Sequence, residues 1–129
     1  MTELEMQALI VDDTPLNLKL LRTLLTANGF QVQTAGSAEE ALQLLAAKRF
    51  GIMFLDLRLP GMDGLALARM LRGDPVYNKL VIVAVTASAM KTDEAAALAA
   101  GCDAFVTKPI NTRALVPFIV TLLARCRDR

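Results

Sequence analysis

Three aspartates follow apolar runs of the sequence, at positions where strands of a buried sheet would end. Asp12 and Asp13 come directly after the apolar residues 8–11, and Asp56 follows residues 52–55. The carboxyl ends of the strands in an open parallel sheet meet at one edge, where ligands bind. Three carboxylates there repel one another unless a cation neutralises them, and an all-oxygen set suits Mg²⁺ better than Zn²⁺. The sequence therefore predicts a Mg²⁺ site at this edge.

A hydroxyl and an ammonium group end two further apolar runs, at Thr86 and Lys108. A carboxylate is a competent nucleophile toward an activated phosphoryl group, and phosphoryl transfer depends mainly on positioning and charge neutralisation. With Asp56 as the acceptor, Lys108 would supply positive charge and the Thr86 hydroxyl would donate to a phosphoryl oxygen. Pro109 follows Lys108, so a cis peptide bond is accessible there and would aim the ammonium into the cluster.

Each of these residues also has a simpler interpretation. Either Asp12 or Asp13 alone would serve the start of a helix at Thr14 and Pro15 through the helix macrodipole. The functional interpretation rests on the joint occurrence of all these groups at strand ends. Taken singly, each of the other residues has an ordinary structural role: Asp56 as a loop acid, Lys108 as a solvated lysine in a turn, Thr86 as a β-former and Phe105 as a core aromatic.

Short β-rich runs alternate with longer segments of helical period, the pattern of a parallel sheet covered by helices. The runs in residues 9–11, 52–55 and 81–85 are continuously apolar, as central strands covered on both faces should be. Residues 31–35 alternate between polar and apolar side chains, which favours an edge strand. The predicted strands are residues 7–11, 31–35, 52–55, 81–85 and 104–107.

Five helices are predicted, one after each strand. The first opens with Thr14 as N-cap and Pro15 at the first helical position, and Ser37 begins a capping box for the second. Pro117 lies inside the last helical pattern, where a proline costs about 3 kcal/mol, so this helix should start late or bend. Its inner side is expected to carry Leu115, Phe118, Ile119, Leu122 and Leu123. The helices are predicted to begin near residues 14, 37, 64, 92 and 111.

The composition fits one domain with a sizeable core, because 54% of the 129 residues are hydrophobic. The 14 lysines and arginines nearly balance 13 acids, so the overall charge gives no reason to expect direct binding to nucleic acid or to a membrane surface. No apolar segment approaches the roughly 18 to 20 residues of a membrane span, and the acidic start lacks the features of a signal peptide. We therefore expect a cytoplasmic protein.

The sequence contains two cysteines and no histidine. Cys102 and Cys126 lie far apart without metal-binding spacing, so reduced thiols without a function are expected. The absence of histidine excludes a Ser-His-Asp triad and a histidine-liganded metal within this chain. Any phosphohistidine that reacts with the chain must therefore belong to another protein.

Four segments together resemble the receiver domain of two-component response regulators: residues 9–13, 54–64, 83–87 and 108–109. Each is weak alone, but four in this order are highly specific. The resemblance covers about residues 7–123 and implies a doubly wound, flavodoxin-like α/β fold with a five-stranded parallel sheet in the order 2-1-3-4-5 and helices on both faces. Because five strand-helix units occupy nearly the whole chain, we expect a single receiver domain over residues 1–129 without an output domain, of the stand-alone or hybrid-kinase type.

The resemblance assigns roles to the residues that meet the phosphoryl group. It implies that Asp56 is the phosphoacceptor and that Lys108 and Thr86 contact the phosphoryl group. Phe105 would occupy the rotameric switch position of the family.

The resemblance also implies a set of metal ligands and modulating residues. Asp13, Asp56 and the backbone carbonyl of Arg58 would bind Mg²⁺, with Asp12 assisting through water. Arg58 and Ser88 stand two residues beyond Asp56 and Thr86, at positions that border the phosphoryl group in this family.

The implied function is a signalling switch that takes a phosphoryl group from a histidine kinase or a histidine phosphotransfer protein. Phosphorylation would then alter the affinity for a downstream protein partner, and a homodimer is compatible with the same resemblance. Such a protein promotes its own phosphorylation and slow dephosphorylation, but it is not a turnover enzyme.

Two other functions compete with this interpretation. One is a Mg²⁺-dependent phosphohydrolase with Asp56 as its nucleophile, but the haloacid-dehalogenase type needs a second aspartate where Arg58 stands. The other is a degenerate receiver that binds partners without phosphorylation, and the intact acid, threonine and lysine set argues against it. A flavin-binding protein of the same topology has no support, because no Ser/Thr/Gly-rich phosphate loop follows Val11.

Overall fold

Strands alternate with helices along the chain, as the pattern of apolar runs predicts. The structure is a computed structural model and describes residues 1–59, 61–87 and 90–128. The strands are β1 (Gln7–Val11), β2 (Gln31–Ala35), β3 (Ile52–Asp56), β4 (Val81–Thr86) and β5 (Ala104–Thr107). The helices are α1 (Pro15–Ala27), α2 (Ala38–Ala47), α3 (Gly64–Arg72), α4 (Lys91–Ala99) and α5 (Leu115–Cys126), with a short 3-10 helix, η1 (Pro75–Tyr77), between α3 and β4.

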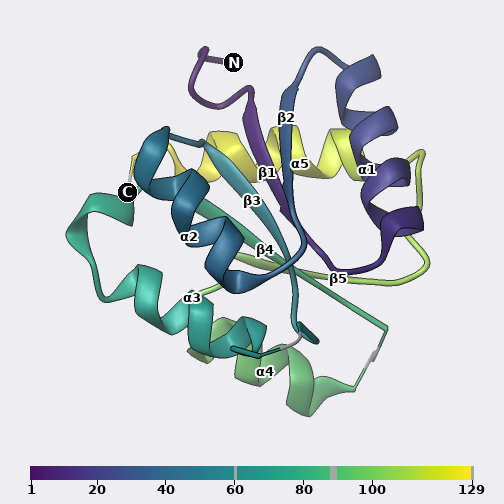
Figure 1. The fold of residues 1–129 in the computed structure, drawn as a ribbon. Helices are drawn as coiled ribbons and strands as arrows, with labels where there is room; N and C mark the ends of the chain where they lie inside the picture. Colours follow the sequence, from purple (N-terminus) through teal and green to yellow (C-terminus); the bar gives the residue numbers. More distant parts are fainter. Residues whose placement is uncertain (60, 88–89, 129) are drawn as a thin grey trace.

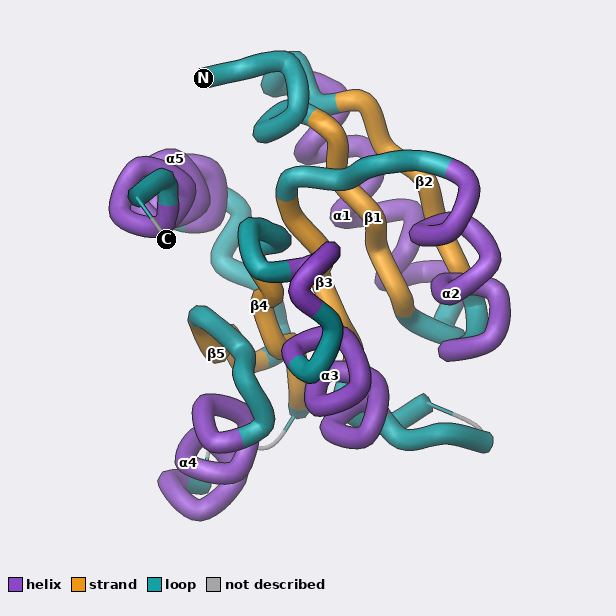
Figure 2. Tube along the Cα trace, turned by 90° about the vertical axis from the view of Figure 1, so that its left-hand side faces the viewer, coloured by secondary structure: helices purple, strands orange, loops and turns teal. Residues whose placement is uncertain are grey.

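All strands pair in parallel in the order β2-β1-β3-β4-β5 (Figures 1 and 2). This confirms the flavodoxin-like order. The alternating strand β2 lies at an edge, as its sequence indicates, while every residue of the continuously apolar strands β3 and β4 is buried.

The helices cover both faces of the sheet, with α1 and α5 on one side and α2, α3 and α4 on the other (Figure 1). Apolar side chains of α1 and α5 belong to one buried cluster, and those of α2, α3 and α4 belong to a second. The sheet separates the two clusters, so the fold is doubly wound. No helix within the described ranges has the length and apolar character needed to cross a bilayer.

Side chains along each strand alternate between the two clusters. In β3, Ile52 and Phe54 face α1 and α5, while Met53 and Leu55 face the other helices. The same alternation in β1 and β5 assigns their even-numbered residues to the α1 and α5 side, whereas in β4 the odd-numbered residues lie on that side. The alternation therefore indicates which face each polar residue at a strand end should occupy.

The helix starts differ in detail from the sequence predictions. Thr14 occupies the N-cap position of α1, but its side chain makes no capping hydrogen bond. Ser37 caps α2 as predicted, because its hydroxyl oxygen accepts the Glu40 N–H at 3.2 Å, while the Glu40 carboxylate accepts the Gly36 N–H at 3.0 Å.

The last helix starts late, which is one of the two outcomes predicted from Pro117. A turn occupies residues 112–114 and α5 begins at Leu115, so Pro117 is the third helical residue. The first N–H groups of a helix have no intrahelical acceptor, so a proline there removes no helical hydrogen bond. The placement of Phe118 on the inner side was wrong: its side chain is 38% exposed, because it lies at the margin of the apolar stripe formed by Leu115 and Ile119.

The two cysteines have different environments. Cys102 is buried between α4 and β5, and this burial raises the pKa of its thiol to about 11. Cys126 lies at the end of α5 and is half-buried. The two cysteines are not joined in a disulfide.

Candidate functional site

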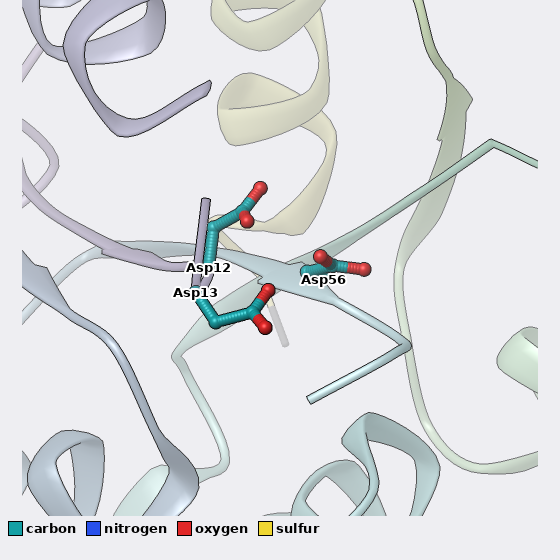
Figure 3. Close-up of side chains that lie close together, drawn as sticks. All are labelled: Asp12, Asp13 and Asp56. Carbon is teal, nitrogen blue, oxygen red and sulfur yellow. The ribbon is translucent and has the colours of Figure 1, made fainter. Parts of the chain in front are cut away.

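The ends of β1 and β3 bring three aspartates together (Figure 3). Val11 pairs with Leu55 in the sheet, so the next residues, Asp12 and Asp56, lie side by side. One carboxylate oxygen from each of Asp12, Asp13 and Asp56 lies within 4.8 Å of the others. Asp12 and Asp56 are 2% and 6% exposed, whereas Asp13 is open to solvent. The cluster therefore has a buried base and an accessible side.

Lys108 bridges the two buried carboxylates. Its Nζ lies 3.3 Å from Asp12 Oδ2 and 3.3 Å from Asp56 Oδ2. All three residues continue the even-numbered series of β1, β3 and β5, which face α1 and α5, so the alternation of the strands accounts for their meeting. The Lys108 backbone N–H donates to the Thr86 carbonyl at 2.7 Å, and the Lys108–Pro109 peptide bond is cis.

Backbone N–H groups hold the remaining oxygens of the buried pair. The Thr14 N–H donates to Asp12 Oδ1 at 2.9 Å, and the Arg58 N–H donates to Asp56 Oδ1 at 3.0 Å. Each buried carboxylate thus has one oxygen bound by a loop N–H and the other by the ammonium. Both side chains are oriented before any ligand arrives.

The surroundings of Asp56 disfavour the ionised form of its carboxyl group. Burial raises its pKa above the ordinary value, and the neighbouring Asp12 charge raises it further. The Arg58 N–H and the Lys108 ammonium act in the opposite direction without cancelling the effect of burial. A site whose carboxyl ionises with difficulty is one that gains from a bound cation.

The loop after β3 packs tightly against Asp56. Asp63 caps α3, because its Oδ1 accepts the Ala66 N–H at 2.8 Å. Gly64 follows, and a Cβ there would lie 2.6 Å from the Asp56 carbonyl oxygen and 2.7 Å from Leu57 Cα. The start of α3 can approach Asp56 only because residue 64 lacks a side chain. Sequence analysis did not assign this role to Gly64, although a glycine directly after an acidic N-cap was the available signal.

Thr86 and Phe105 lie on the opposite face of the sheet from Lys108. The Thr86 side chain continues the series of β4 that faces α4, and the residue is 3% exposed. Phe105 is partly buried against the cluster that α2, α3 and α4 form. The two predicted switch residues therefore share one face at neighbouring strands. Arg58 is exposed beside Asp56, and Ser88 lies outside the described residues.

The donor set fits Mg²⁺. The three carboxylates of the cluster are hard oxygen ligands, and the exposure of Asp13 leaves room for the waters that Mg²⁺ retains. No histidine or cysteine belongs to the cluster, so its chemistry is that of an oxygen-only site rather than a zinc site.

Comparison with known proteins agrees with this geometry. The family model of the response regulator receiver domain matches residues 8–119. The polar-differentiation response regulator DivK of Brucella anthropi is 35% identical over 115 residues, which cover 89% of this chain and 94% of DivK. Members of the family are phosphorylatable signalling modules rather than enzymes in the usual sense.

Two solved structures carry information about ligands. The first is the receiver domain of a Pseudomonas aeruginosa sensor histidine kinase, with a magnesium ion coordinated in its active-site cleft. It is 25% identical to this chain with a TM-score of 0.84, and the match covers 93% of this chain and 98% of that one. The second structure is the complex of the Saccharomyces cerevisiae phosphotransfer protein Ypd1 with the receiver domain of Ssk1. A chain of this complex is 28% identical to the present chain with a TM-score of 0.85, and the match covers 96% of this chain and 92% of that one. The chain therefore belongs to the family of response regulator receiver domains.

Proposed function

We propose that Asp56 accepts a phosphoryl group from a phosphohistidine of a histidine kinase or a histidine phosphotransfer protein, in a Mg²⁺-dependent reaction that alters binding to a downstream protein. One observation carries the proposal. Asp56 ends a central strand beside the carboxylate pair of Asp12 and Asp13, and the Lys108 ammonium lies 3.3 Å from both Asp12 and Asp56. These 129 residues contain no histidine, so the donor phosphohistidine must lie outside them.

The residues present can perform this transfer. An oxygen of ionised Asp56 attacks the donor phosphorus, a P–O bond forms, and the P–N bond to the donor imidazole breaks with its electron pair returning to that ring. Lys108 lies where it can balance the charge of the phosphoryl oxygens, and the Thr86 hydroxyl is assigned to contact one of them.

The metal is assigned to Asp13, Asp56 and the backbone carbonyl of Arg58, with Asp12 assisting through water. When bound, Mg²⁺ would neutralise negative charge on the phosphoryl oxygens and on the aspartates. The Pseudomonas aeruginosa receiver domain, with its magnesium ion in the active-site cleft, supports Mg²⁺ as the metal.

Phosphorylation with a small donor tests the proposal. Mixing the protein with acetyl phosphate and Mg²⁺ should add the mass of one phosphoryl group to the intact chain. Asp56→Asn should abolish the addition, and a chelator should prevent it in the unsubstituted protein. Asp63→Asn is the matched control, because asparagine still caps α3 and the Asp56 cluster is untouched. Labelling of Asp56→Asn at the rate of the unsubstituted protein would refute the assignment.

Arg58 is assigned to shield the acyl phosphate from water. Its backbone N–H binds Asp56 Oδ1, and its long cationic side chain is exposed beside that carboxylate. Arg58→Ala should shorten the lifetime of the phosphorylated protein, followed by intact mass after the donor is removed. An unchanged or longer lifetime would reject this role.

A further inference from the structure

A basic groove lies at the end of the sheet opposite Asp56, between the end of α2 and η1. It has a volume of about 760 Å³ and is lined by residues 45–49 and 75–79. These residues precede β3 and β4, whereas Asp56 is the last residue of β3. At about 3.3 Å per residue, the strand places the groove roughly 15 Å or more from the phosphorylation site.

The groove concentrates positive charge in a chain whose net charge is only +1. Lys48, Arg49 and Lys79 line it, and none of its lining residues is acidic. None of these three cations forms an ion pair with a carboxylate of residues 1–59, 61–87 or 90–128. Arg49 and Lys79 are exposed. The charges are therefore available to an anionic ligand.

An apolar recess adjoins the basic groove and shares several of its lining residues. This smaller hollow of about 60 Å³ is bounded by Lys48, Arg49 and Lys79 and also reaches Leu45 and Phe50. Both apolar residues are 6% exposed, and the Lys48 ammonium lies 5.5 Å from the centre of the Phe50 ring. The recess therefore offers apolar contacts to one aliphatic side chain, next to the three cations that also line it. Leu4 and Val76 also line the recess, and both are exposed, Val76 at 71%.

We propose that the basic groove docks an acidic segment of a partner protein that inserts one aliphatic side chain into the recess. The cations would attract the acidic residues, and the recess would fix the register of the bound segment. A single nucleic-acid strand is a poorer fit, because its bases need exposed aromatic faces to stack on and Tyr77 is half-buried.

Docking in the basic groove is independent of phosphorylation. None of its lining residues comes from α4, β5 or α5, and none touches the Asp56 cluster. The groove would therefore hold a partner in both states of the switch. This inference goes beyond the proposed function and does not require it.

Nuclear magnetic resonance titration of the ¹⁵N-labelled full chain provides the test. The probe is a short synthetic peptide of glutamates with one central leucine, and its partner peptide has serine in place of the leucine. The leucine peptide should shift the amide signals of residues 45–50 and 75–80. The serine peptide should bind several-fold more weakly. Raising the salt concentration should weaken both peptides, because exposed charges are screened.

Charge-reversal variants distinguish binding in the groove from a general attraction of the acidic peptide to positive charges of the protein. The double variant Arg49→Glu, Lys79→Glu should bind the leucine peptide about tenfold more weakly. The control is Lys19→Glu, Arg22→Glu, which makes the same charge change at exposed positions of α1 and should leave the affinity unchanged. Equal weakening by the two double variants, or signal shifts centred away from the groove, would overturn the proposal.

Two further arms test the class and the independence of the partner. A short oligothymidylate that bound these residues more tightly than the leucine peptide would assign the groove to nucleic acid instead. Repeating the titration with Mg²⁺ and beryllofluoride, a phosphoryl mimic, should leave the peptide affinity unchanged within about twofold, since the two sites share no residue. A larger change would refute docking in both states.

Discussion

At the scale of single residues, Asp56 combines burial with a nearby like charge. Because its pKa is raised, the folded protein binds a proton at Asp56 more tightly than the unfolded chain does. The folded state is therefore favoured while Asp56 is protonated, and this advantage is lost as the pH rises through the unfolded-state value near 3.9 and on through the higher folded-state value. At neutral pH the ionised group destabilises the fold.

We predict that Asp56→Asn makes the metal-free protein melt a few degrees higher at pH 7.5, because a neutral amide removes the cost of burying a charge and ends the repulsion with Asp12. The gain should shrink at pH 4.5, closer to the range in which Asp56 of the unsubstituted protein is protonated in both the folded and the unfolded state. Thermal unfolding followed by circular dichroism at the two pH values measures the difference. Asp63→Asn serves as the control, and an equal gain at both pH values would contradict the argument.

Lys108 supplies the internal counter-charge of the carboxylate cluster. Lys108→Met should tighten Mg²⁺ binding about five- to tenfold, because removing an ammonium a few ångströms from the aspartates leaves more negative charge for the metal. The metal-free variant should unfold more easily, by on the order of 1–2 kcal/mol, since two buried carboxylates lose a partner. Calorimetric titration with Mg²⁺ measures the affinity.

Lys79→Met is the matched control for this experiment, because Lys79 is exposed at the other end of the sheet. Lys79→Met should change neither the Mg²⁺ affinity nor the stability of the metal-free protein. Weaker Mg²⁺ binding by Lys108→Met would show that the ammonium does not compete with the metal for these oxygens.

At the scale of the elements, α3 reaches Asp56 only through a position without a side chain. Gly64→Ala would bring a Cβ to 2.6 Å from the Asp56 carbonyl oxygen. We expect a loss of stability of about 1–3 kcal/mol and slower phosphorylation from acetyl phosphate, because relief of the clash must move the strand end that carries the acceptor. Chemical denaturation and intact mass over time measure the two effects.

Gly73→Ala is the matched control at the other end of the same helix. A Cβ there would meet its nearest atoms at 3.5 and 3.6 Å, which is ordinary contact. Its phosphorylation rate should equal that of the unsubstituted protein. If Gly64→Ala also phosphorylates at this rate, the close approach has no effect on the acceptor.

The sequence predicted the elements well because their signals are local. The predicted strands match the observed ones to within one residue at each end, and alternation identified β2 as an edge. Phe118 was misplaced because it lies at the margin of the apolar stripe of α5. A small rotation of the helix about its axis decides whether such a residue is covered. Helical period alone does not give the position of the neighbouring strand.

The sequence predicted that the three aspartates would lie together, but not the contacts within the site. Strand ends indicated which groups would meet, and the Asp12, Asp13 and Asp56 cluster is present. The position of Lys108 between two carboxylates depends on which face each strand end occupies, and this becomes known only when the strands are in register. The role of Gly64 likewise depends on a contact between α3 and β3 that no local pattern reports.

At the scale of the whole molecule, α4 is anchored to α3 just beyond its C-terminal end. Ala97 is the buried residue of the helix, and Met90 at its N-cap makes no side-chain cap. Just beyond its other end, Arg72 donates to the Gly101 carbonyl at 2.7 Å and to the Asp103 carboxylate. The C-terminal end of α4 is therefore held to α3.

We predict that phosphorylation moves α4 and that Thr86 couples the two events. When the Thr86 hydroxyl turns toward a phosphoryl oxygen, it leaves space on the face that Phe105 shares, and a packed interior responds by a discrete rearrangement. A hundredfold shift would need about 2.7 kcal/mol of differential contacts. Thr86→Ala should still be phosphorylated but should lose most of this shift.

Amide exchange with and without beryllofluoride measures the coupling in both proteins. The unsubstituted protein should change most in residues 91–99, and the variant should change little there. Thr107→Ala is the control on the neighbouring strand, because Thr107 pairs with Thr86 in the sheet but is exposed. Equal changes across residues 87–108 in Thr86→Ala and the unsubstituted protein would disprove the coupling.

The contrast between the two thiols makes the native chain suitable for spectroscopic labelling. Cys102 is buried and its thiol pKa of about 11 leaves almost no thiolate near neutral pH, so a maleimide reagent should react first at the half-buried Cys126. A fluorophore or nitroxide attached there would report on the end of α5 without any engineered cysteine. Because Cys102 lies at the anchored end of α4, its slow labelling would independently follow the opening of that anchor.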